Sequence, residues 1–320
     1  MKNIYLPEGS LIGTPENEEY VSSIAGLERA FLEGKILEST VMFCDSSFRL
    51  HIDLNGMLGI MDKDEAMFCR SGESAKDIAI ITRVGKPIAF KVIGFRYENG
   101  TKVAVLSRKQ AQEECQSEYL ATLSIGDIIK AKVTHLESFG AFVDIGCGLS
   151  SLLTVDSISV SRIAHPKDRL FVGEEIFAVV KSRDPENGRI FVSMKELLGT
   201  WEENANEFEV GQTVLGIVRS IEDYGVFIEL APNLAGLAEL RPDSRDADIA
   251  KVGAHVAVYI KSILPDRMKI KLVLIDTYRG TVSRREQKYY INCNSVSHLN
   301  RWIYSPPTAQ KLVETVFECG

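Results

Sequence analysis

The chain has 320 residues, of which 45% are hydrophobic and 25% charged, so it is long enough for more than one globular core and is not disordered as a whole. Its apolar runs, such as Ile78 to Ile81, fall far short of the ~20 residues that cross a bilayer. The formal charge of −7, from 37 basic and 44 acidic side chains, argues at first against a nucleic-acid partner.

The start of the chain, Met1 to Glu8, lacks the apolar run of a secretory signal, so we expect a cytoplasmic protein. The six cysteines form no Cys-x-x-Cys pair, which favours free thiols over a zinc ribbon. The stretch from Thr14 to Leu32 is predicted to be helical, with Thr14 as N-cap and Pro15 in the first turn.

A pattern of β-hairpins follows and recurs along the chain. A Val-Gly pair leads into an alternating apolar strand at Val84, Val172 and Val252, and each strand continues through a turn into a second β-patterned run. These second runs are Lys102 to Leu106, Arg189 to Ser193, and Met268 to Val273. A second block, Ile125 to Val133, recurs as Val210 to Val218. Five short strands in roughly 75 residues indicate a small closed barrel of the oligonucleotide-binding (OB) type.

The predicted fold is therefore all-β with helical linkers, built from three tandem five-stranded OB barrels. Period-3.6 patterning favours connecting helices at Arg108 to Leu123 and at Met194 to Phe208. The expected organisation is an N-terminal helical extension (1–32), a degenerate barrel (33–109), a helical linker (110–123), a barrel (124–196), a helical linker (197–209), a barrel (210–278) and a C-terminal extension (279–320).

The last two units share an aromatic pair around a glycine. Phe139 and Phe142 flank Gly140, and Tyr224 and Phe227 flank Gly225. Strict alternation would send the two rings to opposite faces, but a bulge or tight turn at the glycine would bring both onto one surface as a coplanar platform for nucleic-acid bases. The alternative is that both rings are barrel core, and recurrence of the frame favours the platform.

These residues resemble the RNA-binding motif of bacterial ribosomal protein S1, which polynucleotide phosphorylase and other RNA-handling proteins share. The second unit is the most similar, through Phe139 to Gly146, Val172-Gly173, Asp184 to Arg189 and Val192 to Lys195. The resemblance implies S1-type barrels and an RNA face made of Phe139, Phe142, Thr154, Asp184 and Arg189. Thr154 stands where the family often has His, so its hydroxyl can donate to a phosphate but cannot stack.

The other two units depart further from that motif. In the third, Tyr224 and Phe227 take the aromatic places and Lys269 that of the arginine, while Glu239 would repel phosphates where His is common. The first unit lacks the aromatic frame altogether, which resembles the amino-terminal repeats of ribosomal protein S1 that dock to the small ribosomal subunit. The remaining expected RNA contacts are basic side chains: Lys132, Arg162, Lys181 and Arg219.

Arg162 belongs to a charged loop with Lys167 and Arg169, for which simple solvation is an equally good explanation. The C-terminal extension mixes basic and aromatic residues, including Arg284, Arg285, Lys288 and Arg301-Trp302-Ile303-Tyr304. It would extend an RNA path or, as we favour, form a β-hairpin and a short helix, Pro307 to Phe317, against the third barrel.

Catalytic motifs are missing from the sequence: the five histidines are scattered, and neither a phosphate loop nor a Gly-x-Ser-x-Gly elbow occurs. His51 and Asp53 share a strand face, which we interpret as solvated surface rather than an acid–base pair. We expect no enzyme, no cofactor and no metal. The predicted function is binding of single-stranded RNA, namely mRNA in translation, with the first barrel as a docking module for the small ribosomal subunit.

Two alternatives remain: a protein–protein adaptor and an RNA-processing factor that uses its barrels for docking. Charge does not exclude RNA, because residues 126–196 carry 9 basic and 10 acidic side chains and residues 210–278 carry 8 and 9. With barrels so close to neutral, RNA binding is expected to depend on stacking more than on phosphate neutralisation.

Overall fold

The computed structural model describes residues 5–69, 75–184, 188–239, 251–278, 280 and 287–317. Its contacts divide the chain into two compact units. The first comprises Met1–Leu123, Lys130–Lys132 and Val143–Ser150, and the second comprises Ser124–Ile129, Val133–Phe142 and Ser151–Gly320.

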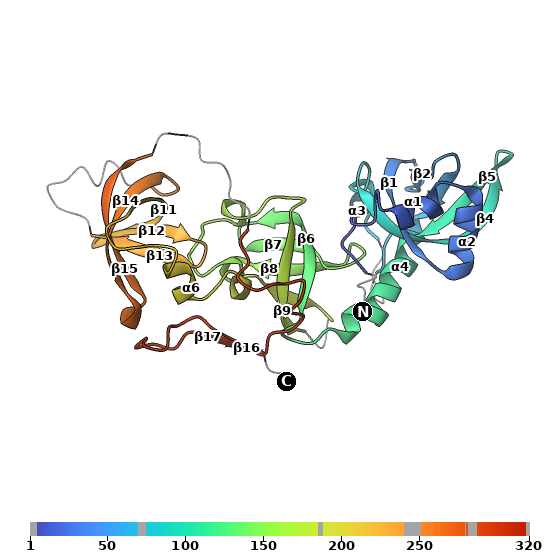
Figure 1. The fold of residues 1–320 in the computed structure, drawn as a ribbon. Helices are drawn as coiled ribbons and strands as arrows, with labels where there is room; N and C mark the ends of the chain where they lie inside the picture. Colours follow the sequence, from blue (N-terminus) through green and yellow to red (C-terminus); the bar gives the residue numbers. More distant parts are fainter. Residues whose placement is uncertain are drawn as a thin grey trace. The chain divides into compact units, whose positions relative to one another are not determined.

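Three closed five-stranded barrels form the framework, as predicted (Figure 1). The first barrel contains β1 (Ile36–Cys44), β2 (Leu50–Asp53), β3 (Leu58–Met61), β4 (Pro87–Glu98) and β5 (Thr101–Ser107). The second contains β6 (Ile128–Glu137), β7 (Gly140–Asp144), β8 (Ser150–Thr154), β9 (Glu175–Arg183) and β10 (Ile190–Ser193). The third contains β11 (Thr213–Glu222), β12 (Gly225–Ala231), β13 (Leu234–Ala238), β14 (His255–Leu264) and β15 (Lys269–Thr277).

All three barrels have the same strand order, in which the first three strands form a meander and the last two close the sheet. Closure depends on one parallel pairing in each barrel, between its third and fifth strands: Gly59 with Ala104, Leu152 with Phe191, and Leu237 with Lys271. The predicted hairpin strands thus lie where the sequence pattern places them, because period-two alternation sends every second side chain into a barrel core. Leu50, Ile52 and Phe90, for example, are fully buried in the first barrel.

The expected N-terminal helix is interrupted and forms two helices, α1 (Pro15–Val21) and α2 (Ile24–Glu33). Thr14 caps α1 as predicted, with its hydroxyl accepting the Asn17 N–H. Ser23 starts a new helix because its hydroxyl accepts the Gly26 N–H, and such serine bonds compete with helix continuation. A Cβ at Gly26 would lie 2.4 Å from the Tyr20 carbonyl oxygen, so glycine permits the close approach of the two helices.

The first predicted linker is helical and the second only partly so. In the first, α4 (Arg108–Glu114) continues without a break as a π-helical turn (Cys115–Tyr119) and a 3₁₀ turn (Leu120–Thr122). In the second, a 3₁₀ turn (Lys195–Leu197) is separated from the short helix α6 (Trp201–Ala205) by Gly199, whose φ of +85° lies in the left-handed region and ends the helical path. The other short helical elements are α3 (Asp77–Ile81), α5 (Val155–Ile158) and the 3₁₀ turns Lys63–Glu65, Pro166–Asp168 and Pro265–Arg267.

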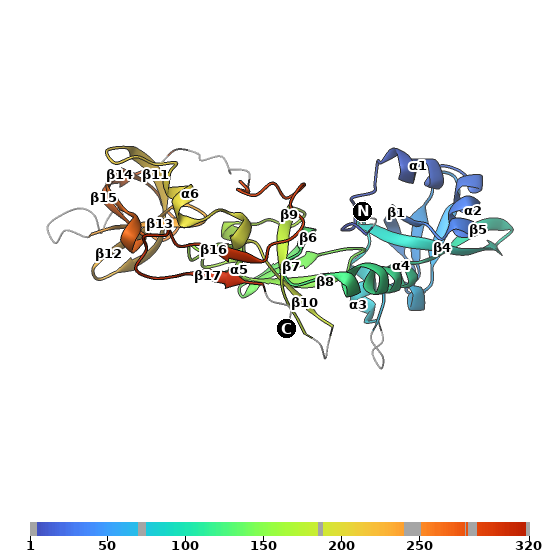
Figure 2. The same ribbon diagram turned by 60° about the horizontal axis from the view of Figure 1, so that its bottom comes forward.

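The C-terminal extension forms a hairpin of β16 (Arg301–Ile303) and β17 (Glu314–Val316), which runs beside α5 (Figure 2). The predicted helix from Pro307 to Phe317 is wrong. Tyr304 N–H donates to the Val313 carbonyl, and Val313 N–H donates to the Ser305 hydroxyl, so the chain turns back as a strand. Arg284 and Arg285 lie outside the described residues.

The hairpin shares a core with the third barrel. Trp201, Trp302 and Tyr304 belong to one buried cluster with strand residues such as Val226 and Ile270. Trp201 N–H also donates to the Tyr304 carbonyl oxygen at 3.0 Å. The extension is therefore an integral part of the second unit.

Candidate nucleic-acid interface

The second barrel presents an aromatic cluster at the end of its first hairpin. Phe139 lies in the turn between β6 and β7 and is 53% exposed, whereas Phe142 lies within β7 and is half-buried. Their ring centroids are 6.0 Å apart and the rings are perpendicular, at 89°. The expected coplanar platform is wrong, because a turn residue is free of strand alternation and the two rings settle into the edge-to-face geometry that aromatic quadrupoles favour.

The φ of Gly140 is not positive, so the residue does not adopt the left-handed conformation of a glycine turn. A Cβ there would lie 2.5 Å from the Leu153 carbonyl oxygen on β8, so glycine is required by close backbone approach. The same holds for Gly225, whose Cβ would lie 2.6 Å from the Ala238 carbonyl oxygen. In the third barrel the bulge lies on the neighbouring strand, where the register shifts between Val218 and Ser220.

The third barrel repeats this ring arrangement closely. Tyr224 lies in the turn between β11 and β12 and is 63% exposed, and Phe227 follows within β12. Their centroids are 6.2 Å apart, again with perpendicular rings at 89°. In both barrels an exposed ring therefore lies perpendicular to a half-buried one.

A third ring, which sequence reasoning missed, completes the cluster in the second barrel. His135 on β6 stacks on Phe142 at a centroid distance of 6.4 Å and an interplanar angle of 29°. Its Nε2 lies 2.7 Å from the Glu137 carboxylate. The repeat could have pointed to this position. His135 corresponds to Ser220 of the third barrel, and Phe142 corresponds to Phe227, with which Ser220 pairs across the first two strands.

The first barrel keeps a ring pair at this same position although its sequence lacks the motif. Phe43 on β1 pairs with His51 on β2, and their rings stack at 4.3 Å and 10°. His51 Nε2 lies 3.0 Å from Asp45, not Asp53, and this hydrogen bond, followed by those from Arg49 and Ser47, holds the pKa of Asp45 below its usual range despite desolvation. The predicted solvated surface is thus a buried histidine in an ion-pair network.

The predicted polar residues of the second barrel lie close to α5. Thr154 ends β8 and its hydroxyl hydrogen-bonds to Ser157, so it is already engaged. Lys181 on β9 donates to the Ser157 hydroxyl at 2.8 Å and lies 3.7 Å from Asp156. The Thr154 hydroxyl, and more weakly the Lys181 charge, lower the pKa of Asp156.

Two further predicted residues flank the β9–β10 turn. Asp184 N–H donates to the Arg189 carbonyl oxygen at 2.8 Å, and the Arg189 side chain is exposed. By contrast, Lys132 on β6 donates to the Glu8 carbonyl oxygen at 3.1 Å and so contacts the N-terminal segment. Arg162 is exposed in the loop after α5, and no ion pair to it occurs among the described residues.

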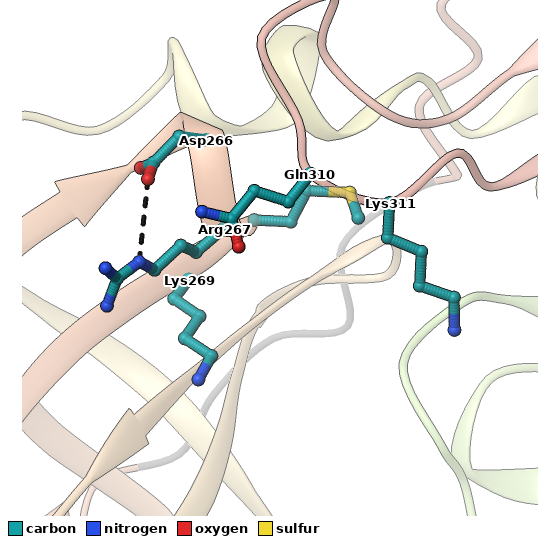
Figure 3. Close-up of a pocket in the computed structure, with 6 residues that line it drawn as sticks. Asp266, Arg267, Lys269, Gln310 and Lys311 are labelled. Carbon is teal, nitrogen blue, oxygen red and sulfur yellow. Dashed lines mark ion pairs between the residues drawn. The ribbon is translucent and has the colours of Figure 1, made fainter.

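Lys269 lies at a small pocket of about 290 Å³ that the third barrel forms with the C-terminal extension (Figure 3). Arg267 and Lys269 come from the β14–β15 hairpin, and Gln310 and Lys311 come from the extension. Arg267 pairs with Asp266 at 3.5 Å, while the Gln310 N–H donates to the Asp266 carbonyl oxygen and fixes the extension over the hairpin. Arg267 and Lys311 were not predicted. Only the fold brings Lys311 beside Lys269, whereas Arg267 is two residues away in the sequence and was overlooked.

Arg219 has a different environment from the one expected. Its Nε donates to the Glu229 carboxylate at 2.7 Å, and Arg169 donates to both oxygens of the same group at 2.7 and 2.8 Å. All three side chains are at least nine-tenths buried. Because these guanidinium groups serve a buried ion triad, we leave Arg219 and Arg169 out of the proposed RNA contacts.

Other kinds of site have little support in the described part of the chain. It contains no group of three or more metal-ligating side chains, and none of its helices is long and apolar enough to cross a membrane. Its five cysteines are free thiols.

Comparisons with known proteins agree with this geometry. Residues 122–195 match the family model of the S1 RNA binding domain. The small ribosomal subunit protein bS1 of Leuconostoc lactis is 34% identical over 178 residues, which are 52% of this chain and 41% of that protein. The bS1 protein of Staphylococcus saprophyticus is 36% identical over 185 residues, 56% of this chain and 45% of that protein.

Among solved structures, a multidomain protein with nucleic acid binding domains from Streptococcus pneumoniae covers 78% of this chain and 76% of its own, at 13% identity and a TM-score of 0.25, which is too low to carry an argument. The chain spans less than half the length of the two bS1 relatives named above. The chain thus contains an S1 RNA binding domain at residues 122–195, within the second of its three barrels, and over about half its length it is similar to bacterial ribosomal protein bS1.

Proposed function

We propose that the chain binds single-stranded RNA through the aromatic clusters of its second and third barrels. The observation that carries this proposal is the recurrence of one ring geometry: Phe139 with Phe142 and Tyr224 with Phe227 have nearly equal centroid distances and the same perpendicular angle. A barrel core would not leave one ring of each pair more than half exposed. Bases of any sequence offer a flat face to such a pair, so binding is expected to tolerate sequence variation.

Phosphate contacts play the smaller part in this proposal. Lys181 lies on β9 and Arg189 beside the β9–β10 turn of the second barrel, and Lys269 lies at the hairpin of the third barrel. Thr154 marks the edge of the RNA face instead of donating to a phosphate, because its hydroxyl is bonded to Ser157. Two linked sites raise the effective concentration of one strand, so the pair of barrels is expected to bind more tightly than either alone.

The proposed biological role is binding of mRNA during translation in the cytoplasm, by analogy with the bS1 relatives. We also propose that the first barrel docks to the small ribosomal subunit. Its support is that the Phe43–His51 pair lies within a compensated network in which Asp45 bonds to both His51 and Arg49, which leaves little for a phosphate to bind.

The test is fluorescence anisotropy with a labelled single-stranded RNA and the variants Phe142→Ala, Phe227→Ala and their double. Loss of one stacked base is worth roughly 1–3 kcal/mol, so each single variant should weaken binding by about 5- to 150-fold. Phe171→Ala is the control, because Phe171 is an exposed phenylalanine of the second barrel outside the cluster. Unchanged affinity in both single variants and the double would refute the proposal and favour a protein–protein adaptor.

A second measurement separates binding from RNA processing. The wild-type protein is incubated with labelled RNA, divalent metal and phosphate, and the RNA is resolved on a denaturing gel. Intact RNA supports a binding role, whereas shortened products would assign the chain to RNA processing.

A further inference from the structure

A groove of about 470 Å³ lies between the second barrel and the C-terminal hairpin. One wall is α5 with the loop that follows it, up to Ile163, and includes Arg162. The other wall comes from β16 and β17, through Trp302, Glu314 and Thr315, and Lys195 also lines the groove. The S1 family model ends at residue 195, so the second wall is outside the matched domain.

The charge of the groove favours an anionic ligand. Its two carboxylates are compensated from outside: Glu314 accepts a hydrogen bond from Arg301 Nε at 2.6 Å, and Asp156 lies 3.7 Å from Lys181 Nζ. Arg162 has no ion pair among the described residues, and Lys195 Nζ makes only a long hydrogen bond of 3.5 Å to the Asp156 carbonyl oxygen in the described part of the chain. Two positive charges are therefore left for a ligand.

One wall also carries an unpartnered polar group. Trp302 is only 7% exposed, and its indole N–H has no hydrogen-bond acceptor in the described part of the structure. A buried donor without an acceptor is unfavourable, because it has lost its hydrogen bond to water and gained none in return. The indole packs on Tyr304 at a centroid distance of 5.5 Å, so the donor belongs to a well-packed wall.

The groove is continuous with the aromatic cluster of the second barrel. Val155 lines the groove, and its N–H donates to the Phe139 carbonyl oxygen at 3.0 Å. Asp156 lines the groove as well and lies 3.7 Å from Lys181 on β9 of the same barrel. A strand that leaves the rings near Phe139 thus reaches the groove without crossing unrelated surface.

We propose that this groove binds further nucleotides of the RNA strand held by the second barrel. Arg162 and Lys195 contact the phosphates of these nucleotides, and the Trp302 N–H donates a hydrogen bond to an acceptor atom of the nucleotide or to a water molecule that hydrates it. The inference rests on the proposed function and adds an element that the barrel fold does not contain. It makes the C-terminal extension part of the RNA-binding surface.

The test compares the double variant Arg162→Ala/Lys195→Ala with the control Lys86→Ala/Lys251→Ala, which removes the same charge from exposed lysines outside the groove. Affinity is measured for single-stranded RNAs of about 4 and about 16 nucleotides, the range of site sizes for one OB fold. The groove variant should lose about 5- to 10-fold in affinity for the long strand, and the slope of log K against log salt should shrink by about 1.4, or 0.7 for each lost phosphate.

Binding of the short strand should be unaffected by the groove variant and weakened by Phe142→Ala. Ultraviolet cross-linking of the long strand should label the peptide that contains Trp302 in the wild type and less in the groove variant. Equal losses of long-strand affinity in the groove and control variants, or an unchanged affinity in the groove variant, would overturn the proposed groove site and leave the proposed stacking function intact. If Phe142→Ala also has no effect, the proposed function itself fails. If a protein binds in the groove and the groove variant still binds RNA with unchanged affinity, the groove is a site for a protein partner and the proposal is overturned.

Discussion

The buried triad of Arg169, Glu229 and Arg219 makes a quantitative prediction about the second unit. Glu229 is 4% exposed and accepts three charge-assisted hydrogen bonds of 2.7 to 2.8 Å from the two arginines. Arg169 comes from the loop that precedes Phe171 in the second barrel, and the other two residues lie on β11 and β12 of the third. The triad therefore joins two barrels within this unit.

Glu229→Gln keeps the shape of the side chain but removes its charge. Two guanidinium groups, with side chains 8% and 9% exposed, would then remain buried without the carboxylate between them, and Arg219 would keep only the longer ion pair of 3.6 Å to Asp168. Breaking a buried ion pair by removing one partner typically costs 3–5 kcal/mol, because the remaining charge has lost its water and its partner. We expect a loss of roughly 3–5 kcal/mol in the free energy of unfolding of this unit.

Urea denaturation followed by tryptophan fluorescence measures this loss selectively. Both tryptophans of the chain, Trp201 and Trp302, lie in the core of the second unit, so the signal reports its unfolding. With a urea m-value of roughly 2–3 kcal/mol/M, the midpoint should fall by about 1–2 M. The control is Glu314→Gln, which removes a more exposed partner of Arg301 and should cost at most about 1 kcal/mol.

The pH dependence supplies an independent check. Burial raises the pKa of Glu229, but hydrogen bonds and charge from Arg169 and then Arg219 outweigh it, so the net pKa is lowered. A lowered folded-state pKa means that the stabilisation is present above the ordinary value of 4.5 and is lost as pH falls through the folded value. The difference between wild type and variant should therefore be constant from pH 8 to about 5 and shrink in acid. A loss below 1 kcal/mol at pH 7, or one equal to that of Glu314→Gln, would refute the structural role of the triad.

Two further predictions concern stability. One carboxyl oxygen of Glu38 accepts the Gly9 and Leu11 N–H groups, and burial above all raises the pKa of Glu38 to about 7. The protonated form is the one that the folded state favours, so stability of the first unit is lost as pH rises through that pKa. Glu38→Gln keeps an acceptor oxygen but cannot ionise, so it should stabilise the first unit by on the order of 3 kcal/mol at pH 8 and leave its stability unchanged near pH 4. Denaturation followed by circular dichroism measures both values, and an equal effect at the two pH values would contradict this reasoning. Gly140→Ala should cost roughly 3 kcal/mol, because its Cβ would lie 2.5 Å from the Leu153 carbonyl oxygen, whereas Gly188→Ala, in open space at φ +56°, should cost only about 1 kcal/mol by thermal denaturation. Similar costs for the two alanines would show that backbone approach is not what requires Gly140.

Sequence similarity between the repeats also shows the limits of motif reading. The first unit lacks the aromatic-Gly-x-Phe frame, yet Phe43 and His51 stack at the position of His135 and Phe142. In the first barrel the phenylalanine lies on the first strand and the histidine on the second, whereas in the second barrel the histidine lies on the first strand and the phenylalanine on the second. Position in the barrel, set by the pairing of the first two strands, was a better guide than the motif.

The sequence alone determined the three barrels, their hairpins and the recurring aromatic frame, because side-chain alternation and turn residues are local patterns that recur in each repeat. The tertiary structure decided how those residues are used. It set Phe139 perpendicular to Phe142, placed Arg219 in a buried triad, and brought Lys311 beside Lys269. Arg169 and Glu229 are 60 positions apart and Asp127 and His298 are 171 apart, and no local pattern specifies such pairs. They form only when barrels and extension pack, since burial of the shared core brings their charges together.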